Sequence, residues 1–291
     1  GLYTANVIAN RTLSIGGKTV DASHLTPDFL ASLREAGGIE ANVTTGYHAI
    51  EFLLWGEDTN RTGPGAGNRP ATDYSTTACT HGNCDRRAEY LKSASTLLIS
   101  DLKEMVADWG ADGKARAALK TQGLATILTG LGSLSYGELA GQRMKLGLLL
   151  HDPEEEHDCF SDTTYLSLMN DAKGIQNVYL GKYTRVDGSV VAGASMSDVV
   201  AAADPALDKE IRDLLEGTLA KFAVMKTRGD SIEKYDQMIG EDNAEGNKVV
   251  QDVIDALVAQ TRGVERAVAL LKLDVQVEGD DSLDNPDAVF Q

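Results

Sequence analysis

Hydrophobic residues recur at helical spacing along most of this 291-residue chain. A period near 3.6 residues predicts α-helices, because it places the apolar side chains on one face. The predicted helices cover residues 26–36, 42–55, 83–109, 115–150, 161–180, 196–203, 205–227, 231–238 and 243–273. A strand signal is confined to 181–193, where Asp187-Gly188 favours the turn of a small β-hairpin. The pattern therefore predicts an all-α fold with at most one small hairpin.

The predicted helix at 42–55 is apolar on nearly every side, so we expect it to be buried. It carries His48 and Glu51, which lie three residues apart and therefore share one helix face. Burying an imidazole and a carboxylate is costly unless each has a partner, and one metal ion can serve both. A histidine satisfied within the core is the alternative interpretation, and the pattern leaves both open.

Two domains are expected, because 291 residues exceed the usual size of a single core. We place a first helical bundle at residues 1–148 and a second at 149–291. The segment 46–51 has a faint counterpart at 174–179, which suggests an approximate internal duplication. In the second copy Gln176 would stand where His48 does, so that copy would lack the metal ligands.

The predicted helix at 115–150 is rich in glycine, and each glycine in a helix interior costs about 1 kcal/mol relative to alanine. We therefore expect a packing or ligand reason for these glycines. Within this stretch Glu138 and Arg143 are charges among apolar residues, and an ion pair is the simplest account of them. The acidic tail that begins at Val277 is expected to lie loose or extended.

The formal net charge of −17 disfavours nucleic acid and anionic membrane surfaces as partners, and it attracts cations. Solubility alone is a sufficient reason for such acidity. No run of 18 apolar residues exists, so the sequence predicts no transmembrane span. The loop at about 56–81 is long enough to be either functional or disordered.

Cys79 and Cys84 bracket a short turn-like segment, which suits a disulfide-closed loop in an oxidising compartment. Free thiols, or a metal clip that includes His81, are the alternatives. The third cysteine, Cys159, is not part of this predicted disulfide.

The polar run at 154–162 offers the further site candidates Glu156, His157, Ser161 and Asp162. Its other interpretation is a solvated helix start, with Ser161 or Asp162 as the N-cap. The His-Glu-x-x-His pattern of zinc peptidases fails in the helix at 42–55, since Ala49 and Phe52 occupy the required positions. A histidine with carboxylates instead suits iron, manganese or zinc. No motif identifies a catalytic residue.

Four segments, in order, resemble the imelysin family: 42–56 with its Gly-x-His-x-x-Glu motif, then 137–144, 156–162 and 174–179. The resemblance implies an all-α protein of two duplicated helical bundles, with a site near the His-x-x-Glu helix. It also implies a periplasmic or surface-anchored bacterial protein of iron uptake. Only 45 residues precede Gly46, so upstream helices of the first bundle are expected to be missing.

From the residues and the resemblance together, we expect a metal ion or an iron-bearing ligand in a cleft between two bundles. His48 and Glu51 are the expected metal ligands, for iron in the first place and zinc in the second. Glu138, Arg143, Glu156, His157, Ser161 and Asp162 are further candidates. An uptake-system protein is an expected partner, and a lipid anchor before processing is one form of surface attachment. The two alternatives are a metallopeptidase of the imelysin type and a binding or adhesion module whose His-Glu pair is structural.

Overall fold

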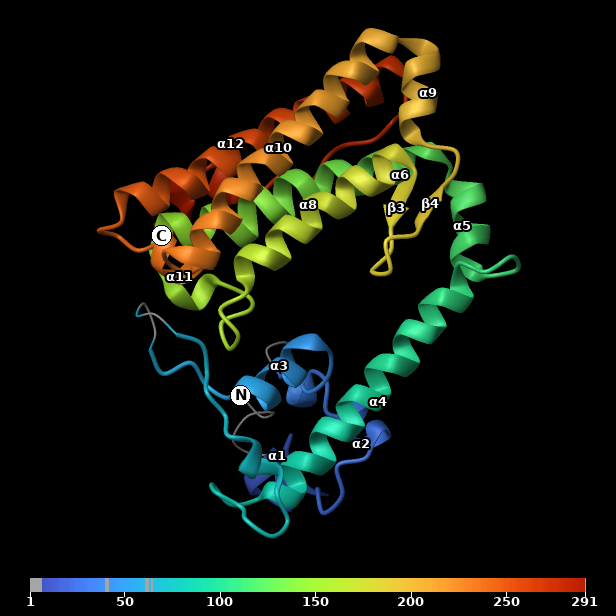
Figure 1. Cartoon of the computed structure of the whole chain (residues 1–291). Helices are drawn as coiled ribbons and strands as arrows, with labels where there is room; N and C mark the ends of the chain where they lie inside the picture. Colours follow the sequence, from blue (N-terminus) through green and yellow to red (C-terminus); the bar gives the residue numbers. More distant parts are fainter. Residues whose placement is uncertain (1–6, 40–41, 61–62, 64, 291) are drawn as a thin grey trace. The chain divides into compact units, whose positions relative to one another are not determined.

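The computed structural model describes residues 7–39, 42–60, 63 and 65–290 of the chain. Helices dominate it, which confirms the predicted all-α fold (Figure 1). Its strands, over these residues, form two two-stranded antiparallel sheets. None of the described helices is both long and apolar enough to cross a membrane.

The chain divides into two compact units, which are Gly1–Thr59 with Gly65–Ala117 and Asn60–Pro64 with Ala118–Gln291. The boundary suggested by the sequence, between residues 148 and 149, falls inside the second unit. The internal duplication stays a prediction.

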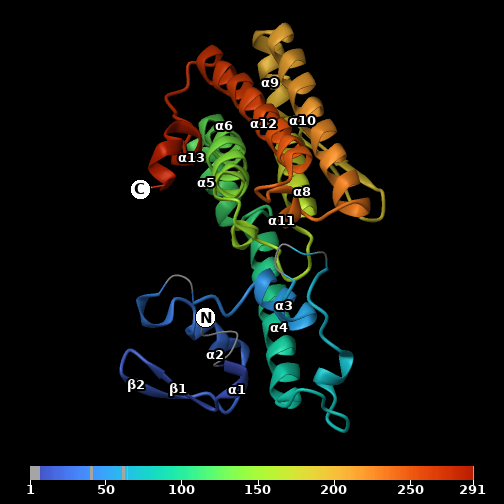
Figure 2. The same ribbon diagram turned by 90° about the vertical axis from the view of Figure 1, so that its left-hand side faces the viewer.

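The first unit contains short helices, one hairpin and one long helix (Figure 2). Its elements are α1 (Val7–Ala9), β1 (Thr12–Ile15), β2 (Lys18–Asp21), α2 (Pro27–Ser32), the 3₁₀ turn η2 (Ala36–Gly38), α3 (Tyr47–Trp55), the 3₁₀ turn η3 (Ala71–Tyr74) and α4 (Cys84–Asp108). The helix α5 (Lys114–Gln122) contains the boundary between the units.

Hydrogen bonds tie the segments of the first unit to α4. The Tyr90 hydroxyl on α4 donates to the Thr44 carbonyl at 2.8 Å, and the Thr44 hydroxyl donates to the Leu30 carbonyl at 2.8 Å. Tyr90 and Leu30 are fully buried, so this chain of bonds fixes the segment that precedes α3.

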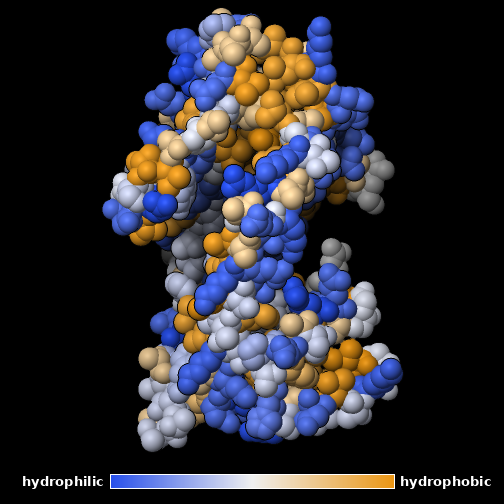
Figure 3. All heavy atoms as spheres, turned by 90° about the vertical axis from the view of Figure 1, so that its right-hand side faces the viewer, coloured by the Kyte–Doolittle hydropathy of each residue, from blue (hydrophilic) through white to orange (hydrophobic). Residues whose placement is uncertain are grey.

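The apolar face of the second half of α4 is only partly covered. Leu102 is 40% exposed and Met105 is 58% exposed. The periodicity predicts which face of the helix is apolar, but it does not show whether another element packs against that face. Figure 3 views the side on which α4 lies in Figure 1, and it shows apolar side chains among the hydrophilic ones.

The second unit is a bundle of long helices around one hydrophobic core. Its elements are α6 (Leu124–Ser133), the π-helix η4 (Leu134–Lys145), α7 (Leu146–Leu150), the 3₁₀ turn η5 (Pro153–Glu155), α8 (Thr164–Leu180), β3 (Lys182–Thr184), β4 (Val190–Ala192), α9 (Met196–Ala203), α10 (Pro205–Ser231), α11 (Tyr235–Met238), α12 (Ala244–Leu270), α13 (Asp281–Asp284) and the 3₁₀ turn η6 (Pro286–Phe290). The helices α10 and α12 lie side by side and bury the apolar stripes of both (Figures 1 and 2).

The hairpin predicted at 181–193 is present as β3 and β4, with Tyr183 opposite Val191. The hairpin of β1 and β2 was not predicted. Its strands pair antiparallel, from Thr12 opposite Asp21 to Ile15 opposite Lys18.

Several glycines of the predicted helix at 115–150 have a packing reason, although Gly130 has open space at its Cβ position. A Cβ atom on Gly132 would lie 2.5 Å from a Val277 methyl group, and one on Gly141 would lie 2.6 Å from Cβ of Asp280. The C-terminal segment therefore lies directly against η4 and the end of α6. The Glu278 amide also donates to the Ser133 hydroxyl at 3.1 Å. The tail is packed rather than loose, and beyond Asp280 it is helical, in α13 and η6, rather than extended.

Candidate functional site

The helix α3 positions His48 and Glu51 side by side. Nδ1 of His48 lies 3.2 Å from Oε2 of Glu51. The helix begins after Gly46, whose φ of 91° favours glycine, because L side chains rarely adopt that conformation. The glycine of the Gly-x-His-x-x-Glu motif thus has a backbone role at the start of the helix.

The burial of α3 is less complete than the sequence suggested. The Glu51 side chain is 10% exposed, but the His48 side chain is 49% exposed. Tyr47 is also 66% exposed, and Leu54 is 44% exposed. The run of hydrophobic residues shows that the helix is apolar, but it does not determine how much of the helix surface other elements cover.

The donor atoms of the pair fit one metal ion. Donors about 2.1 Å from a single ion, at roughly a right angle, are separated by about 3 Å. Nδ1 of His48 and Oε2 of Glu51 have this spacing. Their chemistry, an imidazole nitrogen with a carboxylate oxygen, suits iron or zinc. A charge-assisted hydrogen bond between the same atoms has the same geometry, so the pair can also serve as a structural contact.

In the second unit the polar run at 154–162 contributes to a group of buried acids. Carboxylate oxygens of Glu156, Asp162 and Asp236 all lie within 4.8 Å of one another, and all three residues are buried. Asp236 belongs to α11, far along the sequence, and sequence reasoning missed it. Only the tertiary fold brings it to the other two. Oxygen donors of this kind suit hard cations.

The other candidates of the run lie differently. Nε2 of His157 is 3.7 Å from Oδ2 of Asp158, and the Ser161 hydroxyl lies 2.7 Å from the Thr163 hydroxyl. The predicted N-cap at Ser161 or Asp162 is wrong, because α8 begins at Thr164 with Thr163 as its N-cap residue. Asp162 has a φ of 53° and joins the buried acids instead of an exposed helix start.

Glu138 and Arg143 form an ion pair, with Nη2 of Arg143 3.3 Å from Oε2 of Glu138. They lie five residues apart in η4, and the i, i+5 spacing of a π-helix places them on one face. Both side chains are more than a third exposed, so the pair contributes little to stability.

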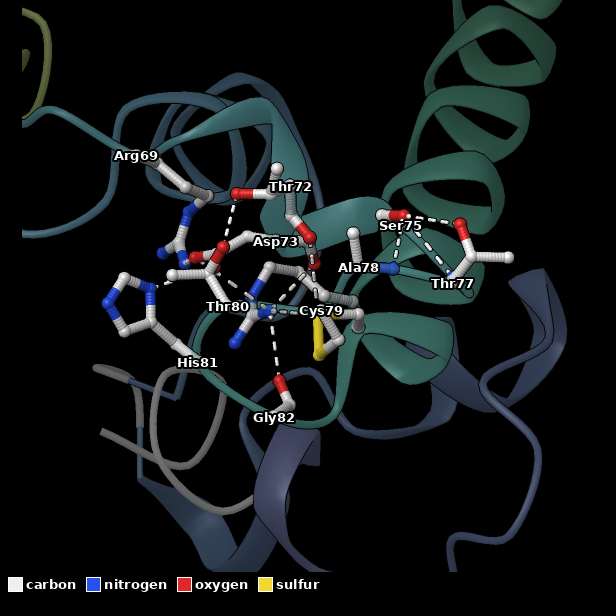
Figure 4. Close-up of a disulfide and its surroundings, with 12 residues drawn as sticks. Arg69, Thr72, Asp73, Ser75, Thr77, Ala78, Cys79, Thr80, His81 and Gly82 are labelled. Carbon is white, nitrogen blue, oxygen red and sulfur yellow. Dashed lines mark hydrogen bonds and ion pairs between the residues drawn. A yellow bond between two sulfur atoms is a disulfide. The ribbon is translucent and has the colours of Figure 1, made fainter.

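The long loop predicted at 56–81 contains an ordered polar cluster that the sequence did not reveal (Figure 4). The carboxylate of Asp73, 2% exposed, accepts a hydrogen bond from Nη1 of Arg69 at 3.1 Å. Its other oxygen lies 2.8 Å from Nδ1 of His81. Arg87 approaches the same carboxylate to 3.9 Å. A disulfide between Cys79 and Cys84 closes the turn that carries His81.

The charge of Asp73 is expected to make the first unit sensitive to acid. Burial raises the pKa of this carboxyl, but the hydrogen bonds from His81 and Arg69, together with the charges of Arg87 and His81, outweigh burial, so its pKa lies below the usual 3.8. Because the pKa is lower in the folded state, the ionised Asp73 carboxylate stabilises the fold above pH 3.8. This stabilisation is lost as the pH falls further and the carboxylate takes up a proton. Urea unfolding at stepped pH tests this, with Asp73→Asn as the variant. The gap in stability between wild type and variant should narrow below pH 3.8. A constant gap would contradict it.

The fold and the site together define a helical protein with a paired imidazole and carboxylate on a short helix. The family model for imelysin, Peptidase_M75, matches residues 3–264. Since the match covers most of the chain, the chain belongs to the imelysin family, which confirms the resemblance seen in the sequence. A comparison with curated proteins finds no match.

Proposed function

We propose that this chain is an imelysin-type metal-binding protein of bacterial iron uptake, with His48 and Glu51 as metal ligands. The observation that carries the proposal is the 3.2 Å distance between Nδ1 of His48 and Oε2 of Glu51. Iron is the first expected metal and zinc the second, since a nitrogen and a carboxylate oxygen suit both. A net charge of −17 favours the approach of cations.

The proposed location is the periplasm or the outer surface of the cell. The disulfide between Cys79 and Cys84 supports it, because such bonds persist in oxidising compartments. An uptake-system protein is the proposed partner, and a metal ion or an iron-bearing ligand is the proposed cargo.

Metal titration followed by calorimetry tests the ligand assignment. Protein purified without a histidine tag is titrated with ferrous iron and with zinc, as wild type and as His48→Ala. Loss of a direct ligand should weaken affinity by about 100-fold or more, since even the loss of supporting partners costs 10- to 100-fold. Affinity should also fall below about pH 6, because protons compete with metal for imidazole.

His24→Ala is the matched control, because its imidazole is 83% exposed in the same unit and lies on another segment. It should bind metal as the wild type does. Equal affinity in wild type and His48→Ala would remove His48 from the site. Asp236→Asn measures separately whether the buried acids of the second unit bind part of the metal.

The same variants distinguish the two alternatives. A peptidase of the imelysin type would cleave an unfolded protein such as casein, a chelator would abolish the cleavage, and Glu51→Gln would suppress it. A structural His-Glu pair would instead show a loss of stability in His48→Ala without any response of the wild type to metal.

A further inference from the structure

In the first unit a cavity of about 490 Å³ opens beside the polar cluster of Asp73. The end of α3 and the loop that follows it form one wall, and Asn68, Arg69, Asp73 and His81 contribute the polar side. A volume of this size is typical of small-molecule pockets. His48 and Glu51 do not line the cavity, so it is separate from the proposed metal ligands.

The cavity walls are held in place by the backbone. The Arg69 amide donates to the Trp55 carbonyl at 2.8 Å. A Cβ atom on Gly67 would lie 2.7 Å from that same carbonyl oxygen, so only glycine allows this close approach. The disulfide between Cys79 and Cys84 closes the turn that carries the lining residue His81 (Figure 4). Little reorganisation is needed before a ligand binds.

Asp73 orients His81 at the cavity. Because the Asp73 carboxyl has a lowered pKa and stays ionised at neutral pH, Nδ1 of His81 is its hydrogen-bond donor. In the neutral imidazole Nε2 then carries the lone pair and acts as an acceptor. Figure 4 shows this second nitrogen on the side of the ring away from Asp73. The His81 side chain is 63% exposed, so a ligand can reach it.

The cavity mixes hydrogen-bond donors and acceptors without a surplus of charge. Arg69 and Asp73 form an ion pair at 3.1 Å and neutralise each other. Glu57 adds a negative charge at the wall, and Arg87, which lies behind Asp73 and does not line the cavity, offsets it. Asn68 both donates and accepts. A charged ligand therefore gains no net attraction from these four charges.

An apolar wall accompanies the polar groups. Phe52 and Trp55 line the cavity, and Trp55 is 38% exposed. The Arg69 guanidinium lies 5.3 Å from the centre of the Phe52 ring, which leaves the Trp55 indole as the accessible aromatic surface. Aromatic rings of this kind contribute large contact area to ligand binding.

We propose that this cavity binds a neutral polyhydroxylated ligand, a saccharide unit. Each sugar hydroxyl donates and accepts, which matches a wall where His81 and Glu57 accept and Asn68 and Arg69 donate. The apolar C–H face of a pyranose ring packs on the Trp55 indole. Because the charges around the cavity nearly cancel, they give neither an anion nor a cation a strong preference over a neutral ligand.

Tryptophan fluorescence tests the proposal in the full chain. The chain has two tryptophans, so Trp109→Phe leaves Trp55 as the single reporter, and Trp109 does not line the cavity. Glucose, N-acetylglucosamine and maltose are titrated separately, with citrate and inorganic phosphate as charged arms. At least one sugar should give a saturable change in Trp55 emission at about millimolar concentration.

In that background His81→Gln and Asn68→Ala should each weaken sugar binding about fivefold, the effect of one lost hydrogen bond near 1 kcal/mol. His24→Gln is the matched control and should have no effect, since His24 lies outside the cavity. Circular dichroism confirms that each variant is folded, and ligand-detected NMR repeats the titration without relying on fluorescence. A saturable response to citrate or phosphate alone, or no saturable response to any sugar by either method, would overturn the proposal.

Discussion

Arg86→Met is expected to destabilise the first unit by roughly 3–5 kcal/mol, because several buried carbonyls would each lose a donor at about 1 kcal/mol apiece. Arg86 is 1% exposed and is the largest of the fully buried side chains. Its guanidinium donates to five backbone carbonyl oxygens, at 2.7–3.2 Å, which belong to Val7, Ile8, Asn10, Ala22 and Ser23. Three of these carbonyls precede the hairpin of β1 and β2 in the sequence, and two follow it. The Arg86 side chain therefore connects both ends of the hairpin to α4.

Chemical denaturation followed by circular dichroism measures this effect, and hydrogen exchange locates it in the first unit. Arg86→Lys should be intermediate, because an ammonium keeps the charge but cannot reach five carbonyls in a plane. Arg11→Met is the control, since Arg11 is 59% exposed and forms a surface ion pair with Asp85. Similar midpoints for Arg86→Met and Arg11→Met would show that the buried guanidinium is dispensable.

Two glycines of α10 should respond to alanine with opposite signs. A Cβ atom on Gly229 would lie 2.7 Å from the ring of Tyr165, which is 3% exposed. The Tyr165 hydroxyl donates to Asp230 at 2.9 Å, so the ring cannot shift without losing that bond. Gly229→Ala is therefore expected to cost about 1–3 kcal/mol by overpacking.

Gly217→Ala is the matched substitution in the same helix, where the added methyl group would have no neighbour within 4 Å. It should stabilise the second unit by up to about 1 kcal/mol, because alanine favours the helix over glycine. Thermal and urea unfolding of both variants measure the difference. Equal changes in the two variants would mean that the contact with Tyr165 is relaxed at little cost.

The hydrophobic pattern predicted most helices of this chain because their apolar stripes face one core, as in α10 and α12. It was less informative about the first unit, where α4 continues beyond its packed half. The sequence does contain a turn signal for the hairpin of β1 and β2. Gly16-Gly17 form its two-residue turn with φ values of 57° and 75°, and this turn type favours glycine at both positions.

The residues of the candidate site also differ in whether the sequence could predict them. His48 and Glu51 could be found in the sequence because both lie on one helix, where spacing alone determines that they are neighbours. Asp236 joins Glu156 and Asp162 only through the fold of the second unit. The pairing of His81 with Asp73 depends on a loop closed by a disulfide, and no periodic pattern describes a loop.

The segment that follows α12 has a consequence for the order of folding. Its residues Val277 and Asp280 fill space that glycines 132 and 141 leave on α6 and η4. The Tyr136 hydroxyl also donates to Asp284 at 2.6 Å. During synthesis these helices emerge from the ribosome well before the segment that covers them. The faces of α6 and η4 that this segment covers are therefore expected to stay exposed until the residues up to 284 have left the ribosome.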